Sequence, residues 1–479
     1  MITQVPYYLW RFTLKRLSFR PNLLTSFILI ILFCSGCAHY QVNQPLETAT
    51  QKESYDFDHF NQPPDADEIF IVLTFSGGGT RAAALAYGVL EKMQAIKLPN
   101  SPKSLLDEID VISTVSGGSF TGAYYALFGE NIFTDFKKKF LYRSIEKELT
   151  LKLFNPITWF RLASPYFSRI DLAAELYDQT IFESKTFETL AQKAKRPFVI
   201  VNATNVYQGG RFEFTSDQFR YLGSDVLSYP MARAVAASSA FPFLLVPISL
   251  VNYIYPSDFQ IPQEDQLALE DYWNNKRRYY SSLNNVMYEN KEEHPFLHLM
   301  DGGLADNLGL RAIYDLYVRG NIRQKINNNK IKRFLVIVVN AKPKAPQDFD
   351  KRETPPGLAE VGLKTCTLSM ENYSFETVEI FKELISERIK TQKHINDCQK
   401  LLDTHCEDGF TITPLAGSQL KLYIADLTFD NLPQKSERDY FNNLPTSFTL
   451  NKSVVDKLIE VGGRLLEEHP QFKKFMEEY

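Results

Sequence analysis

Three glycine-rich turns, each directly after an apolar run, limit the folds open to this chain more than any other feature. The turns and the runs before them are Gly77-Gly78-Gly79 after residues 69–75, Ser116-Gly117-Gly118 after 109–115, and Asp301-Gly302-Gly303 after 296–300. Short apolar runs bounded by glycine are typical of buried strands, and the first two turns lead into helical patterns at 81–96 and 119–127. A strand that turns into a helix is the repeating unit of an α/β fold.

The chain continues this alternation beyond the turns. Further strand patterns lie at 198–202, 211–215 and 334–340, with helical stretches between several of them. We therefore predict an α/β fold with a mostly parallel central sheet and helices on both faces. The 479 residues, 44% of them hydrophobic, suffice for a large core, and a net charge of −4 gives no electrostatic reason to expect nucleic-acid binding.

The N-terminus has the pattern of a targeting segment. Four basic residues precede an apolar run at 23–33, which is too short for a comfortable membrane span. Small residues then lead into Cys37. This pattern resembles a bacterial lipoprotein signal, with residues 1–36 as the signal peptide and Cys37 as the acylated first residue of the mature protein. Ala38 resembles the sorting signal for the outer membrane. An uncleaved signal anchor is the alternative.

The remaining chain is predicted to hold one folded domain. Residues 37–68 are polar and are expected to form a tether, and residues 69–479 are expected to form the domain. Two stretches resemble insertions, at about 252–295 and about 345–415. The second contains a helical pattern over 371–406. A final helix at 452–478 is expected to be interrupted at Gly462-Gly463.

Three cysteines follow Cys37. Cys366, Cys398 and Cys406 lack histidine or acidic neighbours at the spacing of a metal site, so we predict no metal. In an oxidising compartment Cys398 and Cys406 are candidates for a disulfide that leaves Cys366 free.

Ser116 is the candidate nucleophile. A serine hydroxyl needs a base, an exposed position and stabilisation of the oxyanion that it creates. A sharp turn from strand to helix raises the side chain above the sheet edge, and Gly117 and Gly118 let the backbone and a substrate approach closely. A serine that only caps the following helix is the alternative reading of this turn.

Gly77, Gly78 and Gly79 are candidates for an anion-binding loop, because their amides lie at the positive end of a helix. The loop lacks the Gly-Lys-Ser/Thr ending of a nucleotide-phosphate loop, so a developing oxyanion is the expected partner. Arg81 is expected to hold the loop in shape, with a lipid phosphate as the alternative partner.

Asp301 is the candidate base. A carboxylate at the same sheet edge as Ser116 would accept the serine proton directly, without a histidine. His298 lies three residues before Asp301 on a strand, which puts its side chain on the opposite sheet face. A turn-forming Asp-Gly pair without catalytic role is the alternative for Asp301.

Together these segments resemble the patatin-like phospholipase family. The order of the three turns agrees, and the similarity extends to residues 232–242 and to Asp306-Asn307-Leu308-Gly309. The resemblance implies a three-layer fold, a Ser116–Asp301 dyad, and a lipid ester such as membrane phospholipid as substrate, without a cofactor. It also implies an oxyanion hole formed by Gly77, Gly78, Gly79 and Gly117. Supporting positions implied by the resemblance are Arg81, Gly118, Gly302 and Gly303.

Two residues depart from the family pattern. Thr114 stands at the first glycine of the usual Gly-x-Ser-x-Gly elbow, and Phe243 stands where a glycine often follows Pro242. A β-branched side chain crowds such a turn, so either its neighbours are reduced in size or activity is weakened.

We therefore expect a serine lipid acyl hydrolase of phospholipase A type, anchored by a lipid on Cys37. Two alternatives remain: a non-catalytic outer-membrane lipoprotein that binds lipid or a partner, and a serine peptidase with a Ser–His–Asp triad. The apolar stretch 151–167 is expected to form either an interfacial lip or a core-packing helix pair.

Overall fold

The structure is a computed structural model that describes residues 38–50, 53–60, 68–99, 101–342, 351–405, 411–417 and 419–479. The predicted signal peptide at 1–36 and the predicted lipidation site Cys37 lie outside the described residues. The chain divides into two compact units: Met1–Tyr40 with Leu153–Ser168, and Gln41–Lys152 with Arg169–Tyr479.

The second unit is built around an eight-stranded sheet in the order β10-β9-β2-β3-β4-β8-β7, with β5 also paired to β4. Its strands are β2 Ile69–Phe75, β3 Ile109–Val115, β4 Phe198–Asn205, β5 Arg211–Glu213, β7 Ile248–Val251, β8 Phe296–Asp301, β9 Arg333–Asn340 and β10 Lys421–Thr428. A two-residue ladder joins β1, Gln44–Pro45, to β6, Ser224–Asp225. Strands β10, β9, β2, β3 and β4 are parallel neighbours, which confirms the predicted mostly parallel α/β sheet.

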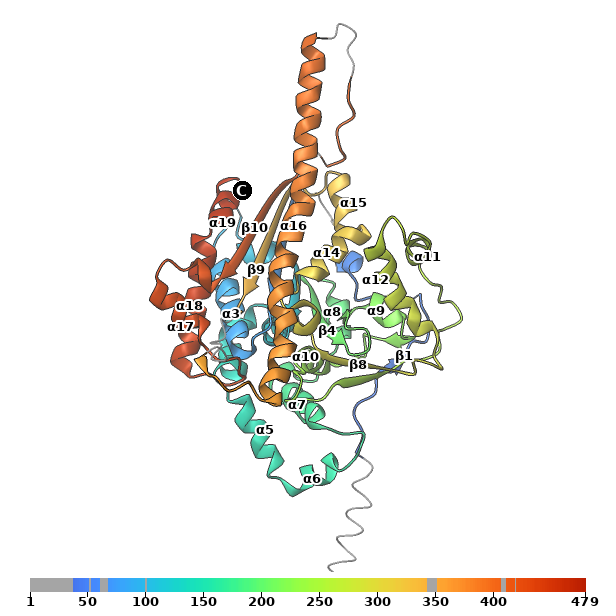
Figure 1. The fold of residues 1–479 in the computed structure, drawn as a ribbon, viewed down its shortest axis with the longest axis vertical. Helices are drawn as coiled ribbons and strands as arrows, with labels where there is room; N and C mark the ends of the chain where they lie inside the picture. The colour runs from blue at the N-terminus through green and yellow to red at the C-terminus, as the bar shows by residue number, and fades with distance from the viewer. Residues whose placement is uncertain are drawn as a thin grey trace, which may run out of the picture. The chain divides into compact units, whose positions relative to one another are not determined.

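Burial explains why the central strands lack the alternation of a half-exposed strand. Every residue of β3 and β4 is buried, so both faces of the sheet are covered. Figure 1 shows helices on both sides of it.

The helices of the described chain are α2 Phe57–Phe60, α3 Gly79–Ala95, α4 Gly117–Phe128, α5 Ile145–Leu153, α6 Pro156–Leu162, α7 Arg169–Tyr177, α8 Phe187–Lys193, α9 Ser216–Arg220, α10 Met231–Ser238, α11 Gln263–Glu270, α12 Lys276–Val286, α13 Gly303–Asp306, α14 Leu310–Arg319, α15 Asn321–Asn327, α16 Leu358–His405, α17 Lys435–Asn442, α18 Lys452–Glu468 and α19 Pro470–Glu477.

Strand β8 reaches the site from the direction opposite to β3. It pairs antiparallel with β4, with Asp301 opposite Ala203, whereas β3 pairs parallel with β4, with Val115 opposite Asn202. Val115 and Asp301 therefore lie opposite two adjacent residues of β4, which fixes their relative positions along the sheet. Asp301 and Ser116 do meet at one edge of the sheet, as predicted, but the strands that carry them run in opposite directions.

The predicted tether is folded where the structure describes it. Tyr55, Phe57 and Phe60 are buried in the core, and the Tyr55 hydroxyl donates to the Val199 carbonyl at 2.6 Å. Aromatic side chains spaced through a polar segment thus fasten residues 53–60 to the sheet. The prediction of a tether over 37–68 is wrong for this part.

Two predictions about the C-terminal helices need correction. Helix α18 runs unbroken through Gly462-Gly463. The glycine serves helix packing instead, because a Cβ at Gly462 would lie 2.5 Å from the Leu85 carbonyl oxygen of α3, and only glycine allows this close contact. The break comes instead at His469-Pro470. Helix α16 begins at Leu358, well before the predicted start at 371, and its far end extends away from the rest of its unit (Figure 1).

Cys366 and Cys398 are free thiols, so the predicted bridge from Cys398 is not formed. Cys406 itself lies outside the described residues.

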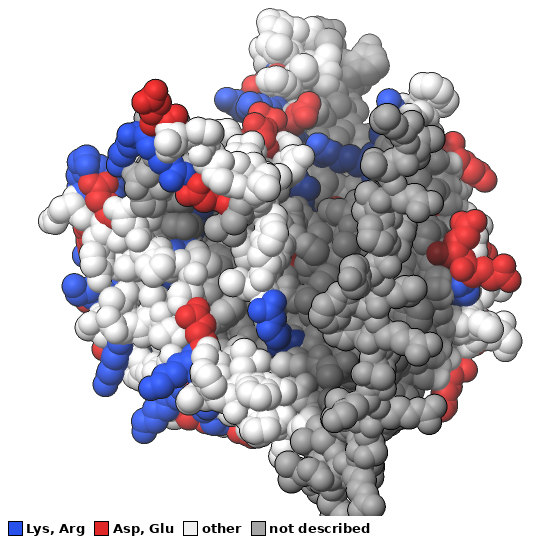
Figure 2. Space-filling view, turned by 60° about the horizontal axis from the view of Figure 1, so that its bottom comes forward, with Lys and Arg blue, Asp and Glu red and all other residues white. Residues whose placement is uncertain are grey.

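The surface offers no large field of one sign in the view of Figure 2, where acidic and basic side chains of the described residues are interspersed. No helix in the part of the chain that the structure describes is long and apolar enough to cross a bilayer. Nor do three or more potential metal-ligating side chains gather anywhere within those residues.

The apolar stretch of the first unit is exposed. Phe154, Ile157 and Trp159 have exposed fractions of 71%, 68% and 60%, so they do not form a core-packing helix pair. Within the same unit the Tyr40 amide donates to the Tyr166 carbonyl at 2.8 Å.

Candidate active site

Ser116 occupies a strained turn between β3 and α4. Its backbone angles are φ 49° and ψ −119°, a conformation that non-glycine residues rarely adopt and that costs about 1–3 kcal/mol. The turn places Ser116 at the N-cap of α4, but the side chain makes no capping hydrogen bond. This contradicts the alternative reading of Ser116 as a helix-capping serine.

The hydroxyl of Ser116 points at Asp301 instead. Ser116 Oγ donates to Asp301 Oδ2 at 2.8 Å, and the Gly303 amide donates to the other oxygen, Asp301 Oδ1, also at 2.8 Å. Both Ser116 and Asp301 are buried. The structure thus brings together two predicted residues that lie far apart in the sequence, in the geometry of a nucleophile and its base.

Burial tunes the acidity of Asp301. Desolvation raises the pKa of the carboxyl to about 6, while the hydrogen bonds from Gly303 and Ser116 oppose this rise only in part. No cation among the described residues contributes to holding the charge. A carboxylate with such a pKa is ionised at neutral pH and is a stronger base than an exposed aspartate.

The glycine loop lies against the serine turn. A Cβ at Gly117 would lie 2.1 Å from the Gly79 carbonyl oxygen, so this approach requires glycine. The Gly77 amide donates to the Asn307 carbonyl at 3.0 Å, which removes it from the predicted oxyanion donors. The amides of Gly78, Gly79 and Gly117 have no acceptor among the described residues and remain as candidate donors.

Arg81 is fully buried and binds three backbone or hydroxyl oxygens. Its guanidinium donates to the carbonyls of Ala341 at 2.8 Å and Leu444 at 2.6 Å, and to Thr446 Oγ1 at 3.0 Å. Burial lowers its pKa to about 10. These contacts fit the predicted role of holding the loop in shape and leave no face for a lipid phosphate.

The segment 444–447, which Arg81 binds through Leu444 and Thr446, also contacts the glycine loop directly. The sequence did not reveal this contact. The Thr80 amide donates to the Ser447 carbonyl at 2.9 Å, and a Cβ at Gly79 would lie 2.4 Å from that same oxygen. No motif marks Ser447, because its backbone rather than its side chain makes the contact.

Ser238 links the nucleophile to the base. Its Oγ accepts the Ser116 amide at 2.8 Å and contacts Ser119 Oγ at 2.9 Å, and its carbonyl accepts the Gly302 amide at 3.1 Å. It lies in the run 232–242 that carried part of the family resemblance, which was the only signal for it in the sequence.

The histidines lie elsewhere in the described part of the chain. His298 is exposed on the opposite face of β8, where its Nδ1 contacts Ser249 Oγ at 2.8 Å. No described histidine hydrogen-bonds to Ser116 or Asp301, which removes the basis for a Ser–His–Asp triad.

Comparison with known proteins identifies the family. The model of the patatin-like phospholipase family matches residues 73–314, about half of the chain. The chain belongs to the patatin-like phospholipase family. The match spans the glycine loop, the serine turn and the Asp301 turn, and ends before α16 and β10. A search of curated proteins found no relative.

Among solved structures, human GIVD cytosolic phospholipase A2 is similar to this chain with a TM-score of 0.35 and 13% identity, over 66% of this chain and 50% of the other. The same human enzyme with methyl gamma-linolenyl fluorophosphonate has a TM-score of 0.39 and 11% identity, over 94% of this chain and 63% of the other. The chain thus spans less than two thirds of the length of these chains.

The patatin-like turn accommodates Thr114 through a glycine on the next helix. Thr114 Oγ1 donates to the Ile200 carbonyl at 3.0 Å, and its methyl group Cγ2 would lie 2.3 Å from a Cβ at Gly122. Gly122 thus provides the reduced neighbour that the sequence called for. Phe243 has a φ of +68°, which accounts for the glycine usual at its position.

We predict that Gly122→Ala destabilises the protein by about 1–3 kcal/mol, the usual range for overpacking, because the new methyl group collides with Thr114 Cγ2. Thr114→Ser removes that methyl group but keeps the hydroxyl, so Thr114→Ser/Gly122→Ala should recover most of the loss. Chemical unfolding of the two single variants and the double variant measures the coupling. Strictly additive effects would contradict the contact.

Proposed function

We propose that the protein is a serine lipid acyl hydrolase of phospholipase A type that uses Ser116 as nucleophile and Asp301 as base. The observation that carries the proposal is the 2.8 Å hydrogen bond from Ser116 Oγ to Asp301, a buried carboxylate without a cationic partner among the described residues. The strained serine turn and the free amides beside it support the same assignment.

The reaction proceeds in two steps. Ser116 Oγ attacks the ester carbonyl carbon while Asp301 takes its proton, and the amides of Gly78, Gly79 and Gly117 stabilise the oxyanion. Collapse of the tetrahedral intermediate breaks the bond to the alcohol, which receives the proton from Asp301. Water then attacks the acyl-enzyme, gives a proton to Asp301, and releases the fatty acid as the proton returns to Ser116 Oγ.

A fluorophosphonate probe tests the nucleophile. We expect covalent labelling of the wild-type protein and of His298→Ala, and none of Ser116→Ala, because only an activated serine reacts with the probe. Mass spectrometry of the labelled peptide locates the adduct. Equal labelling of Ser116→Ala would refute the assignment. Absence of labelling in the wild type would favour the non-catalytic lipid- or partner-binding lipoprotein.

The pH dependence of hydrolysis tests the base. Asp301 works only when deprotonated, so kcat/KM for a non-ionising ester should be constant near neutral pH and fall as the pH drops through about 6. An ordinary aspartate would place this limb near pH 4. The usual pKa of a histidine is close to the pKa of about 6 for Asp301, so a histidine base would give a similar limb. The matched control is therefore His298→Ala, which should leave the limb in place. A limb that disappears in His298→Ala would exclude Asp301 as the base.

We further propose that the protein is an outer-membrane lipoprotein whose lipid on Cys37 holds it beside a bilayer substrate. Ala38, His39 and Tyr40, which follow that cysteine, lie in the same unit as the exposed stretch. The Ala38 carbonyl accepts Ser164 Oγ at 2.5 Å, and the His39 ring stacks on Tyr166 at 5.0 Å between centroids. A lipid on the preceding residue would therefore bring Phe154, Ile157 and Trp159 to the membrane surface, where exposed apolar side chains are stabilised.

Metabolic labelling with a palmitate analogue in a bacterial host tests the anchor. We expect the label on the wild-type protein and on Cys366→Ala, and its loss on Cys37→Ala, because the thioether at Cys37 carries the diacylglycerol. The wild type should also sediment with the outer membrane. Label that persists on Cys37→Ala would contradict lipidation at this site.

A further inference from the structure

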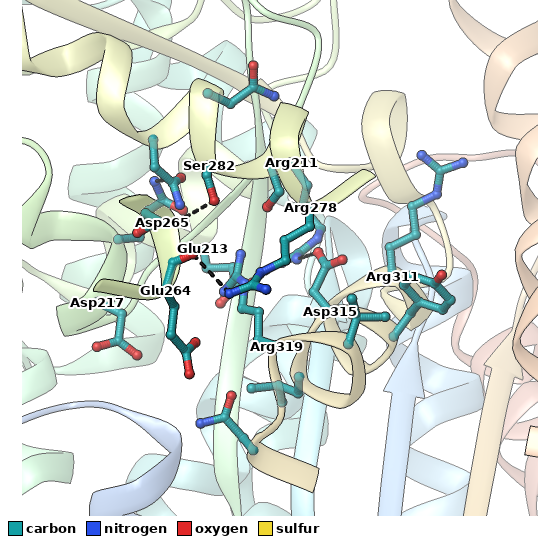
Figure 3. Close-up of a pocket in the computed structure, with 18 of the residues that line it drawn as sticks. Arg211, Glu213, Asp217, Glu264, Asp265, Arg278, Ser282, Arg311, Asp315 and Arg319 are labelled. Atoms are coloured by element: carbon teal, nitrogen blue, oxygen red, sulfur yellow. Dashed lines mark hydrogen bonds and ion pairs between the residues drawn. The ribbon is translucent and has the colours of Figure 1, made fainter. Parts of the chain in front are cut away.

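A charged cavity lies apart from Ser116 and Asp301, under the insertion at 252–295. It has a volume of about 670 Å³, and neither of these residues nor any residue of the glycine loop lines it. Strand β5 and helix α14 contribute one side, and helices α11 and α12 of the insertion contribute the other. Figure 3 shows Glu213, Arg278, Asp315 and Arg319 pointing toward one another across it.

The side formed by β5 and α14 is a balanced ion network. Arg211 on β5 pairs with Glu213 and with Asp315 of α14, and Arg319 lies 3.9 Å from Glu213. Two cations therefore meet two anions. Arg211 is more than nine-tenths buried, yet its Nε donates to no acceptor among the described residues. A buried guanidinium nitrogen without an acceptor is costly unless a ligand supplies one.

The insertion adds cations without matching anions. Lys276, Arg277 and Arg278 form the first turn of α12, which contains no acidic residue. The Arg278 guanidinium donates to the Glu264 carbonyl at 3.0 Å, and Arg277 donates to the Tyr314 hydroxyl. Neither arginine has a carboxylate partner in the described chain. The N-terminal end of a helix carries a partial positive charge, which repels these basic side chains. A bound anion would relieve this repulsion.

The acidic residues of α11 and α9 do not neutralise this turn. Asp265 accepts the Ser282 hydroxyl at 2.5 Å and also the Tyr221 hydroxyl, and Asp217 pairs with Arg220 at 3.0 Å. Glu264 meets Arg278 through its carbonyl rather than its carboxylate. In all, seven basic and five acidic side chains line the cavity, an excess of positive charge.

We infer that this cavity binds a phosphate group, which bridges Arg277 and Arg278 of the insertion to the side formed by β5 and α14. Arginine guanidinium groups match phosphate oxygens in a bidentate fashion, and the excess of positive charge favours an anion over a cation as the occupant. The phosphate belongs either to a free phosphate compound or to the headgroup of a lipid. This site is independent of the ester-hydrolysing function proposed above, and its test does not require hydrolysis.

Isothermal titration of the purified full chain with pyrophosphate and, separately, with dihexanoyl phosphatidic acid below its micellar concentration tests the site. We expect at least one probe to bind, and Arg277→Gln/Arg278→Gln to weaken that binding by about tenfold or more. Pyrophosphate alone would indicate a free phosphate compound, and phosphatidic acid alone would indicate a lipid headgroup.

The matched control is Lys473→Gln/Lys474→Gln, which removes the same charge from exposed positions on α19, away from the cavity. It should leave the affinity unchanged. Thermal unfolding separates a binding defect from misfolding, because the arginine variant should keep the melting temperature of the probe-free protein but lose the rise that the probe causes in the wild type. The proposal is overturned if neither probe binds, or if both double variants weaken binding equally.

Discussion

The antiparallel pairing of β8 with the end of β4 is the constraint on which the candidate active site depends. Strand β4 continues past the end of β3, and the backbone groups of this extension are available for another strand. Strand β8 takes that position and ends at Asp301, one residue further along β4 than the level of Val115. The sheet itself therefore sets the separation between the hydroxyl and the carboxylate, and Ser238 secures the two turns to each other through its side chain and its carbonyl.

Two buried carboxylates in this protein show how surroundings decide chemistry. Asp301 has two hydrogen-bond donors and no cation, and burial raises its pKa to about 6. Burial also raises the pKa of Glu213, but Arg211 and Arg319 outweigh that effect, so the pKa of Glu213 lies below its usual value. The first carboxylate is suited to exchange a proton near neutral pH, and the second is suited to hold a permanent charge.

Segments beyond the family match complete the glycine loop. The carbonyls of Leu444 and Ser447 bind Arg81 and the Thr80 amide, and a Cβ at Gly303 would lie 2.3 Å from Met370 Cε on α16. The catalytic turns therefore depend on contacts with residues of the C-terminal part of the chain.

The sequence by itself determined the local units of this protein. Apolar runs and glycine turns predicted β2, β3 and the serine turn, and the order of the turns carried the resemblance to the patatin-like family. Only the tertiary structure decided the direction of β8, the loss of the Gly77 amide to Asn307, the packing of residues 53–60 and the unbroken course of α18. Strand and turn patterns follow from neighbouring residues, whereas strand pairing, backbone acceptors and close helix contacts depend on chain segments that no local pattern connects.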